Sequence, residues 1–410
     1  MKFDLIISIP KNTEDEAIFK EKTVSSTLII GSSTCLFMVD KFPFTTLIDA
    51  LKYALSLKKQ IFVTGVPKVI TFILKYYSQL IHKVHISILA NECDTFNFGH
   101  EWVISSYVTN PEFTHYEIIK NINGENEYLS VLCNVLNHGV YREGRNGSVK
   151  SIFGQHMKFN LENGFPLLTT KKMFFRGIVE ELLFFLNGHT DNNILREKNI
   201  NIWTANTSRE FLDSIGFTTR KEGLMGPMYG AQWRHFNGDY DIETGEMSGG
   251  IDQLKYVINT ILKEPYSRRI LMTDFNPSQA EEGVLYPCHS IILQFYIEDE
   301  FLDCFCFNRS SDVFLGLPFN IASTALLMYI IGKITHLTPR FLNLSLGDAH
   351  IYKGHIQNSQ MQLTRKPFVF PQLQISDRLK TLTDISQLKY NDFILSNYQH
   401  HNAIQAEMVA

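Results

Sequence analysis

The stretch from Asn308 to Ser323 limits what this 410-residue chain can fold into more than any other part. It begins with an arginine, two serines and an aspartate, passes through a turn that contains glycine and proline, and ends where an asparagine opens an apolar, helix-like run. Arg309 and Ser310 form a fork that suits a phosphate, and the planar amide of Asn320 suits the edge of a heterocycle. A solvated Arg-Ser loop and a helix-capping asparagine are the alternative interpretation.

A nucleotide has both a phosphate and a heterocycle and would suit both groups. A second stretch, Leu285 to Tyr296, favours this interpretation. In it Cys288 and His289 follow Pro287 and enter a strand-like apolar run. Together the two stretches resemble the thymidylate synthase family, in which a Pro-Cys-His nucleophile segment precedes an Arg-Ser-x-Asp-x-x-x-Gly-x-Pro-x-Asn motif. The resemblance extends from about Glu127 to the C-terminus, and it implies a mixed sheet with flanking helices.

The composition is that of a folded protein with room for two domains, because 44% of the residues are hydrophobic and 20% are charged. A net charge of −4 argues against non-specific binding of nucleic acid. No apolar run approaches the roughly 20 residues of a membrane span, and no signal peptide is evident at the start. We therefore expect a cytoplasmic protein that binds neither nucleic acid nor membrane.

The six cysteines show no spacing typical of a disulfide scaffold or a zinc site. Reduced thiols and no metal are expected. Cys304 and Cys306 alternate with phenylalanines, a pattern that predicts side chains packed on one face of a strand.

Residues 1–118 are predicted to form a small open α/β sheet domain. Strand-like runs at Lys2–Ile9, Thr27–Ile30, Ile61–Thr64 and Val84–Leu89 alternate with helix-like segments at 46–57 and 69–80. This order, with its glycine turns, resembles dihydrofolate reductase.

The reductase-like domain lacks the parts that its chemistry would need. Pro10–Ser26 is too short for the family's glycine-rich loop and acidic helix, and Val66 stands where a second glycine normally admits a pyrophosphate. We therefore expect a degenerate, structural domain that does not use NADPH. An active reductase and an unrelated small α/β domain are the alternatives.

A linker at 119–126 and a second domain at 127–410 are predicted next, with a helix over Glu127–His138. The basic loop Arg142–Gly147 suits a phosphate, and the resemblance assigns that contact to Arg145, with Arg142 as the alternative. The adjacent Arg268 and Arg269 precede the strand Ile270–Met272. The resemblance implies a homodimer in which this pair reaches the partner's phosphate site.

The apolar helix Phe174–Leu186 carries Glu180 and Glu181 in its middle. A carboxylate there is costly unless a polar group meets it, so Glu181 is either a surface residue or an acid of the active site. The resemblance favours the active site, and it places Trp203 and Tyr229 around the folate and nucleotide cavity. Core packing is the alternative for these two aromatic residues.

His350 and Tyr352 lie two residues apart on a strand-like segment and therefore face the same side, where they suit ribose hydroxyls. The remaining site residues are assigned by the resemblance alone. His289 joins the nucleotide contacts, Asp312 binds both the nucleotide and the pterin, and Gly316 and Ala410 complete the folate site, over which the apolar C-terminus closes.

The resemblance implies reductive methylation of dUMP by 5,10-methylenetetrahydrofolate, which leaves as dihydrofolate. The thiolate of Cys288 adds to uracil C6 and so activates C5. A depressed thiol pKa is expected, with Arg309 supplying the positive charge. Glu181 manages protons.

Two further functions stay open. A deoxycytidylate hydroxymethylase has the same scaffold and nucleophile. Asn320 favours uracil, because the family members that act on cytosine nucleotides carry aspartate at this position. A non-catalytic scaffold is supported by two departures from the family's usual residues, Asn308 in place of glutamine and Thr204 in place of aspartate. Residual reductase activity would instead make the chain bifunctional.

Overall fold

The structure is a computed structural model that divides the chain into two compact units. One unit comprises Met1–Ile122 with Lys366–Val369, and the other comprises Asn123–Arg365 with Phe370–Ala410. Within these units the structure describes residues 3–8, 27–31, 37–39, 42–44, 61–64, 81–89, 102–109, 111, 113–121, 124–144 and 146–407.

The first unit contains an eight-stranded sheet with the order β4-β3-β2-β5-β1-β6-β8-β7. The inner strands β2, β5, β1 and β6 run parallel, and the outer strands pair antiparallel. The four predicted strands are confirmed, whereas the helices expected at 46–57 and 69–80 lie outside the described residues, as does Val66. The strand bounds are β1 Phe3–Ser8, β2 Thr27–Gly31, β3 Phe37–Val39, β4 Phe42–Phe44, β5 Ile61–Thr64, β6 Ile81–Leu89, β7 Trp102–Thr109 and β8 Phe113–Lys120.

A short segment from late in the chain completes this sheet at β7. The backbone N–H of Ile104 donates to Pro367 O at 2.9 Å, and Val369 N–H donates to Ile104 O at 2.9 Å. Nothing in the sequence of Lys366–Val369 predicted that it belongs to the first unit.

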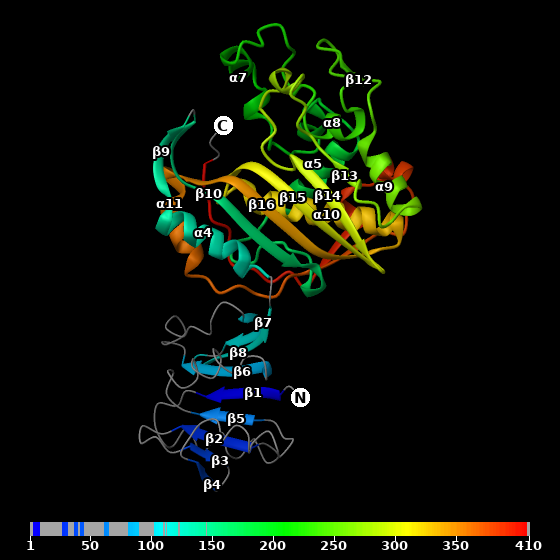
Figure 1. Ribbon diagram of the computed structural model, residues 1–410. Coiled ribbons are helices and arrows are strands. Elements are labelled where there is room, and N and C mark those ends of the chain that lie inside the picture. The colour runs from blue at the N-terminus through cyan, green and yellow to red at the C-terminus, as the bar shows by residue number, and fades with distance from the viewer. Residues whose placement is uncertain are drawn as a thin grey trace. The chain divides into compact units, whose positions relative to one another are not determined.

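The second unit is built on a six-stranded mixed sheet with the order β13-β14-β15-β16-β10-β9 (Figure 1). Only β15 and β16 pair in parallel, and the other neighbours are antiparallel. This confirms the mixed sheet implied by the resemblance. The strand bounds are β9 Val140–Gly144, β10 Gly147–Asn160, β13 Leu271–Met272, β14 Ile292–Glu298, β15 Phe301–Asp312 and β16 Thr338–Tyr352; the two small hairpins are β11 Asp239–Tyr240 with β12 Met247–Ser248 and β17 Gln372–Ile375 with β18 Phe393–Ser396.

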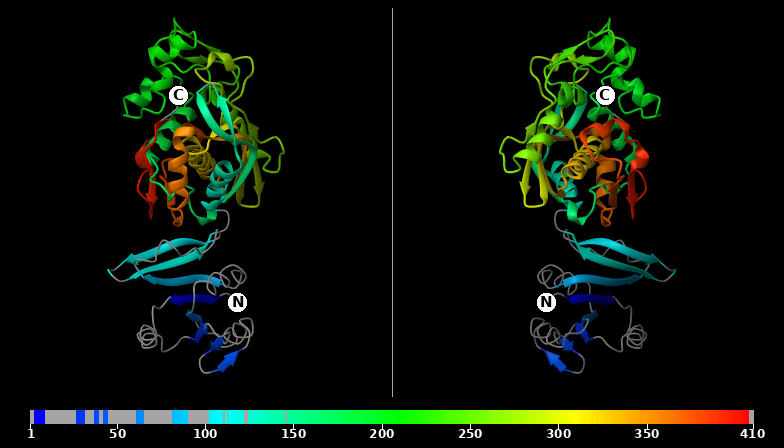
Figure 2. Two further views of the ribbon diagram at one scale, coloured as in Figure 1. Left: turned by 90° about the vertical axis from the view of Figure 1, so that its left-hand side faces the viewer. Right: turned by 90° about the vertical axis from the view of Figure 1, so that its right-hand side faces the viewer.

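Two apolar helices form the centre of this unit. Helix α10 (Gly316–Thr335) packs on β15, β16 and α5 (Phe175–Leu186), as Figures 1 and 2 show. By length and composition α10 is long and apolar enough to cross a membrane, but 72% of its apolar window is buried inside the fold. It is therefore the core helix of this unit. The remaining helices are α4 Asn126–His138, α6 Asn193–Arg196, α7 Arg209–Ser214, α8 Gly230–His235, α9 Gln253–Lys263 and α11 Ile356–Leu363.

Helix α9 begins at a side-chain cap, and helix α10 begins earlier than predicted. Asp252 caps α9, since its carboxylate accepts from Lys255 N–H at 2.9 Å. Helix α10 begins at Gly316 rather than at Asn320, because the backbone becomes helical directly after the Asp312 turn. Asn320 consequently lies inside the helix and is not its cap.

One face of the sheet is covered by α10 and the other is open. Along β14 the residues alternate between exposed and buried, as period-two side-chain geometry requires. Cross-strand pairing places Leu271, Ile292, Tyr296 and Phe305 on the open face, where Tyr296 is 63% exposed. The buried face holds Cys304 and Cys306, which confirms the predicted packing.

Candidate active site

Cys288 lies in a loop at the end of the sheet and not in a strand. Strand β14 begins only at Ile292, because Ser290 adopts a left-handed backbone with φ of 58° that interrupts the extended run. Several hydrogen bonds hold the loop to β15. Ser290 N–H donates to Asn308 Oδ1 at 2.9 Å, and Ser310 N–H donates to Cys288 O at 3.2 Å.

Tyr229 contacts the thiol directly. Its hydroxyl lies 3.3 Å from Cys288 Sγ and accepts a hydrogen bond from Cys288 N–H at 3.2 Å. Burial raises the pKa of Tyr229 well above its usual value, so the phenol keeps its proton and can donate to a thiolate. Tyr229 itself has a φ of 48° just before α8, a strained conformation of the kind that clusters at functional sites.

The side chain of Arg309, also on β15, holds the same loop. Its Nε donates to Pro287 O at 3.1 Å and an Nη donates to Tyr286 O at 3.3 Å. The side chain is otherwise exposed, so guanidinium donors remain accessible to an anion. Arg309 therefore contacts the backbone of the loop that carries the nucleophile and presents a positive charge to solvent.

The expected depression of the thiol pKa is wrong for this structure. Burial raises the pKa of Cys288, and the lowering effects of the Tyr229 hydroxyl and the Arg309 charge do not offset it. His289 supplies no charge either, because burial lowers its pKa to about 4. Its ring stacks on Tyr229 with 4.4 Å between centroids.

Glu181 and Glu180 are neighbours on α5 with different surroundings. Glu181 is buried and accepts a hydrogen bond from Trp203 Nε1 at 2.8 Å, while burial raises its pKa to about 7. Glu180 pairs instead with Lys198 at 2.7 Å and lines a separate cavity of about 640 Å³. Of the two interpretations of Glu181, the surface residue is excluded. Trp203 is both a core aromatic residue and the partner of this acid.

Asp312 ends β15 and shapes the turn into α10. Its Oδ1 accepts from Phe314 N–H at 3.0 Å and from Leu315 N–H at 3.2 Å, which leaves Oδ2 without a backbone partner in this turn. The buried Lys171 donates to Phe314 O in the same turn, and burial lowers the pKa of its amine to about 7. Gly316 follows as the first residue of α10. Sequence reasoning missed Lys171, although its charge faces Asp312.

The end of β16 places His350 and Tyr352 near Asp312. Asp312 and His350 are register partners in the parallel β15–β16 pair. His350 and Tyr352 face the same side as predicted, with ring centroids 5.3 Å apart. His350 Nδ1 lies 2.9 Å from Asp348 Oδ1, which orients the imidazole.

The predicted arginines are not all gathered at this site. Arg268 and Arg269 are exposed in the loop before β13, and Arg142 is exposed on β9. Arg145 and Ala410 lie outside the described residues. No group of three or more His, Cys, Asp or Glu side chains suited to a metal occurs within the ranges that the structure describes.

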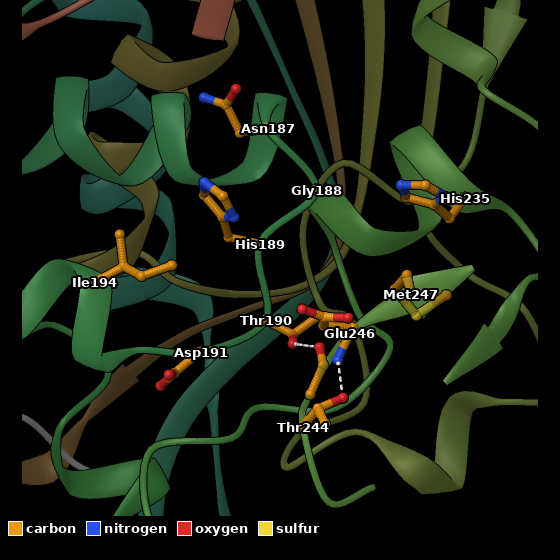
Figure 3. A pocket seen from close by; sticks show the side chains of 11 residues that line it. Asn187, Gly188, His189, Thr190, Asp191, Ile194, His235, Thr244, Glu246 and Met247 are labelled. Atoms are coloured by element: carbon orange, nitrogen blue, oxygen red, sulfur yellow. Dashed lines mark hydrogen bonds between the residues drawn. The ribbon is translucent and has the colours of Figure 1, made fainter. Parts of the chain in front are cut away.

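A polar cavity of about 370 Å³ lies elsewhere in the second unit (Figure 3). It is lined by the chain after α5 and by the β11–β12 hairpin, which Thr190 holds by donating to Gly245 O. His189, Asp191, His235 and Glu246 face it. None of the predicted site residues lines this cavity, so it is separate from the Cys288 site.

Comparisons with known proteins agree with this arrangement. A family model described as thymidylate synthase matches residues 126–410. Human thymidylate synthase is 45% identical over 288 residues, which cover 70% of this chain and 91% of the relative. Thymidylate synthase of varicella-zoster virus (strain Dumas) is 44% identical over 289 residues, 70% of this chain and 95% of the relative.

A bifunctional relative also matches, but over a smaller share of its own length. The bifunctional dihydrofolate reductase-thymidylate synthase of Plasmodium chabaudi is 42% identical over 302 residues, which cover 72% of this chain. The matched region spans only 51% of that relative, about half its length. The family is one of methyltransferases that use methylenetetrahydrofolate as co-substrate. The match of residues 126–410 and the identity to the human enzyme place this chain in the thymidylate synthase family.

Proposed function

We propose that the second unit converts dUMP to dTMP by reductive methylation, with 5,10-methylenetetrahydrofolate as the donor of carbon and hydride. The observation that carries this proposal is the surroundings of Cys288, with the phenol of Tyr229 at 3.3 Å from the sulfur and the guanidinium of Arg309, from β15, hydrogen-bonded to the backbone of the Cys288 loop. That constellation suits a thiol that must add to an electron-poor ring carbon.

In this proposal Cys288 forms a bond to C6 of the uracil ring. The sulfur supplies the electron pair, and C5 becomes nucleophilic as the ring takes up negative charge. Tyr229 donates to the thiolate that precedes the bond, because its phenol keeps its proton. Arg309 and Ser310 bind the phosphate, together with Arg145 and with Arg268 and Arg269 of a second copy. The stacking of His289 on Tyr229 holds the imidazole beside the proposed position of the uracil ring.

Recognition of the base and ribose is assigned to α10 and β16. Asn320 donates to uracil O4 and accepts from N3, and His350 with Tyr352 binds the ribose hydroxyls. The amide distinguishes uracil from cytosine, which presents an amine instead of a carbonyl. An Asn320→Asp variant should therefore gain activity on dCMP relative to dUMP by about tenfold or more. An unchanged ratio of the two activities would remove this assignment.

Glu181 handles protons at O4 and C5 through ordered water. A pKa of about 7 lets its carboxyl both donate and accept a proton near neutral pH. Asp312 binds the pterin through Oδ2, and Trp203, Gly316 and Ala410 complete the folate side. The free carboxylate oxygen and the buried acid fit a ring that carries several N–H donors. The folate supplies the one-carbon unit and the hydride.

Covalent trapping tests the proposal. The full-length chain should form a stable complex with 5-fluoro-dUMP and methylenetetrahydrofolate, and it should release tritium from 5-tritiated dUMP when the folate is present. Mass spectrometry should find the nucleotide on the Cys288 peptide. If the unmodified chain traps nothing, the scaffold interpretation replaces this one.

A homodimer is proposed through the open face of the sheet. Leu271, Ile292, Tyr296 and Phe305 are large hydrophobic side chains exposed on this face, and a second copy presents the same face by twofold symmetry. Arg268 and Arg269 lie directly before β13 at its margin, exposed and therefore free to reach a partner's phosphate. A Tyr296→Lys variant should sediment as a monomer, whereas a variant that stays dimeric would exclude this face.

The first unit is proposed to have a structural role without reductase activity. The supporting observation is the short Pro10–Ser26 segment, in which the reductase family's glycine-rich loop and acidic helix have no room. We expect no NADPH-dependent reduction of dihydrofolate by the chain. Reduction at a rate comparable with its tritium release would make the chain bifunctional.

A further inference from the structure

The C-terminal segment His401–Glu407 has no helix or strand of its own, yet hydrogen bonds hold its main chain. The carbonyl oxygens of Asn402, Gln405 and Glu407 each accept a hydrogen bond from a side chain. Terminal segments are usually poorly ordered unless such contacts tie them down. These three carbonyl groups therefore mark the points at which the segment is fixed.

The three donors come from one stretch of the chain, α11 and the residues next to its two ends. His355 stands directly before α11, and its Nε2 donates to Glu407 O at 2.8 Å. Asn358 lies in the first turn of the helix, and its Nδ2 donates to Gln405 O at 3.0 Å. The donors advance along the helix while their acceptors retreat along the segment, so the two run in opposite directions.

Arg365, just after α11, joins the start of the segment to the core. Its Nη1 donates both to Asn402 O and to Thr170 O, each at 2.7 Å. The main chain at Thr170 is itself fixed by Glu125, a fully buried carboxyl group that accepts from Thr170 N–H at 2.9 Å. A single guanidinium nitrogen thus fastens the segment to a part of the chain that is anchored in the interior.

His355 places the end of the segment beside groups from both sides of the proposed active site. The imidazole is 3% exposed, and its centroid lies 5.4 Å from that of Phe314 and 5.9 Å from that of Tyr352. Phe314 belongs to the Asp312 turn, which is proposed to bind the pterin, and Tyr352 is proposed to bind the ribose. A carbonyl oxygen can only accept, so Nε2 carries the proton, and the buried Nδ1 has no hydrogen-bond partner among the described residues. The bond to Glu407 is therefore what a histidine supplies here and a phenylalanine would not.

We propose that His355, Asn358 and Arg365 form a clasp that holds the segment His401–Glu407 in place before any ligand binds, so that the C-terminus closes over the folate from a segment that is already ordered. Ordering a free segment at the moment of closure costs conformational entropy for every residue, and the clasp removes that cost from the binding step. The three are positioning residues, because they act through the main chain of the segment and do not touch the reacting atoms. The clasp deepens the proposed function, which assigns Ala410 to the folate site.

Proteolysis tests the clasp without nucleotide or folate. Endoproteinase Glu-C must take the carbonyl group of Glu407 into its own active site, so cleavage there requires the bond from His355 to open. The intact mass of the full-length chain, followed over time, measures the loss of the last three residues. The unmodified chain should lose them about tenfold or more slowly than a synthetic peptide of residues 397–410. Equal rates for the chain and the peptide would overturn the clasp without the use of any variant.

Removing a donor should speed this cleavage. His355→Phe and Asn358→Ala should each raise the rate by about three- to tenfold, because each loses one hydrogen bond, and Arg365→Met should raise it by about tenfold or more, because it loses a charged donor. Gln357→Ala is the matched control, since Gln357 is exposed on α11 and bonds to none of the three carbonyl oxygens. The thermal midpoint of each variant separates release of the segment from global unfolding. Rates in all three variants that equal the rate of Gln357→Ala would exclude the clasp.

A second readout connects the clasp to the reaction. Asn358→Ala should lower kcat/KM for methylenetetrahydrofolate by about three- to tenfold and leave the Kd of dUMP within about twofold, because the segment closes over the folate side. Faster cleavage with an unchanged kcat/KM for the folate would overturn the role in closure. If covalent trapping fails while the cleavage rates change as expected, the clasp stands and the proposed function does not.

Discussion

In the proposed active site the nucleotide side holds the partly exposed thiol of Cys288 and the folate side holds the buried carboxyl of Glu181, and these two acids have different partners. The Cys288 thiol has the phenol of Tyr229 at 3.3 Å, and Arg309 on β15 donates to the backbone of its loop, but burial still raises the pKa of the thiol. Glu181 has a single donor, Trp203 Nε1 at 2.8 Å, and its pKa rises only to about 7. The buried carboxyl of Glu181 already has a pKa near neutral. The thiol of Cys288 needs several neighbouring donors or positive charges to lower its pKa enough to ionise.

The difference predicts what each side loses when one group is changed. On the nucleotide side the chemistry depends on one sulfur, and the neighbours adjust it. On the folate side the proton equilibrium depends on one hydrogen bond. Variants that remove the acids should therefore have the largest effects, and variants that remove their partners should have smaller effects of different kinds.

Replacing the nucleophile should have the largest effect. Cys288→Ala should lower kcat by roughly four orders of magnitude or more, because no other group can form the bond to C6. Tritium release from 5-tritiated dUMP measures this loss. Cys304→Ala is the control, since that thiol is buried on β15, and it should retain trapping while losing about 1–3 kcal/mol of stability. Turnover by Cys288→Ala near the normal rate would refute the mechanism.

Removing the acid on the folate side should cost less. Glu181→Gln should lower kcat by about 10²- to 10³-fold, because the amide cannot transfer a proton. Glu180→Gln is a matched control one residue away. Its buried carboxylate pairs with Lys198 and not with Trp203, so kcat should stay within about twofold of normal while stability falls by about 1–3 kcal/mol. Equal losses of kcat in the two variants would show that the helix, and not the acid, is needed.

Glu181→Gln should also change the pH dependence of stability. The folded pKa of Glu181, about 7, lies above its usual value of 4.5, so the unfolded chain loses this proton first as the pH rises. The unmodified chain should lose stability between these two values, and the amide variant should not. Above pH 7 the variant should gain up to roughly 3 kcal/mol relative to the unmodified chain. Thermal unfolding at pH 5 and pH 8 measures the difference.

The sequence predicted the elements of the second unit because each one carries its own periodic pattern. Helix α5 follows from its apolar run, and the shared side of His350 and Tyr352 follows from the period of a strand. The motif residues themselves needed the family resemblance, because an Arg-Ser loop or a lone histidine is not distinctive. The mixed sheet likewise came from the family and not from the local pattern.

What the sequence did not predict depends on contacts between distant segments. Asp274 follows a short strand and has no local feature that shows its complete burial. Lys171 faces Asp312 only because the chain folds back over 141 residues of sequence. The raised pKa of Cys288 is also a property of packing, since the nearby Arg309 favours the opposite direction. The spacing of residues along the chain does not predict burial that is caused by contacts between distant segments.

The phenol on the nucleotide side should have an intermediate effect. Tyr229→Phe removes the hydroxyl at 3.3 Å from Sγ and should lower kcat by about 10- to 100-fold while the thiol still traps 5-fluoro-dUMP slowly. Tyr128→Phe is the control, since that buried hydroxyl donates to Gln362 Oε1, at 3.4 Å. A Tyr229→Phe enzyme with normal kcat would mean that Arg309 alone supports the thiolate.

The donor on the folate side should have the smallest effect on rate and the clearest effect on pH. Trp203→Phe removes the hydrogen bond that lowers the pKa of Glu181, so that pKa should rise from about 7 by about one unit. The ionisation of Glu181 in the pH profile of kcat/KM should then move to higher pH. Trp233→Phe is a matched control in the same aromatic cluster around Phe185, and its buried Nε1 has no hydrogen-bond partner. Because Trp233→Phe removes the same atoms without removing a donor to Glu181, its profile should not move, and an equal shift in both variants would attribute the effect to packing.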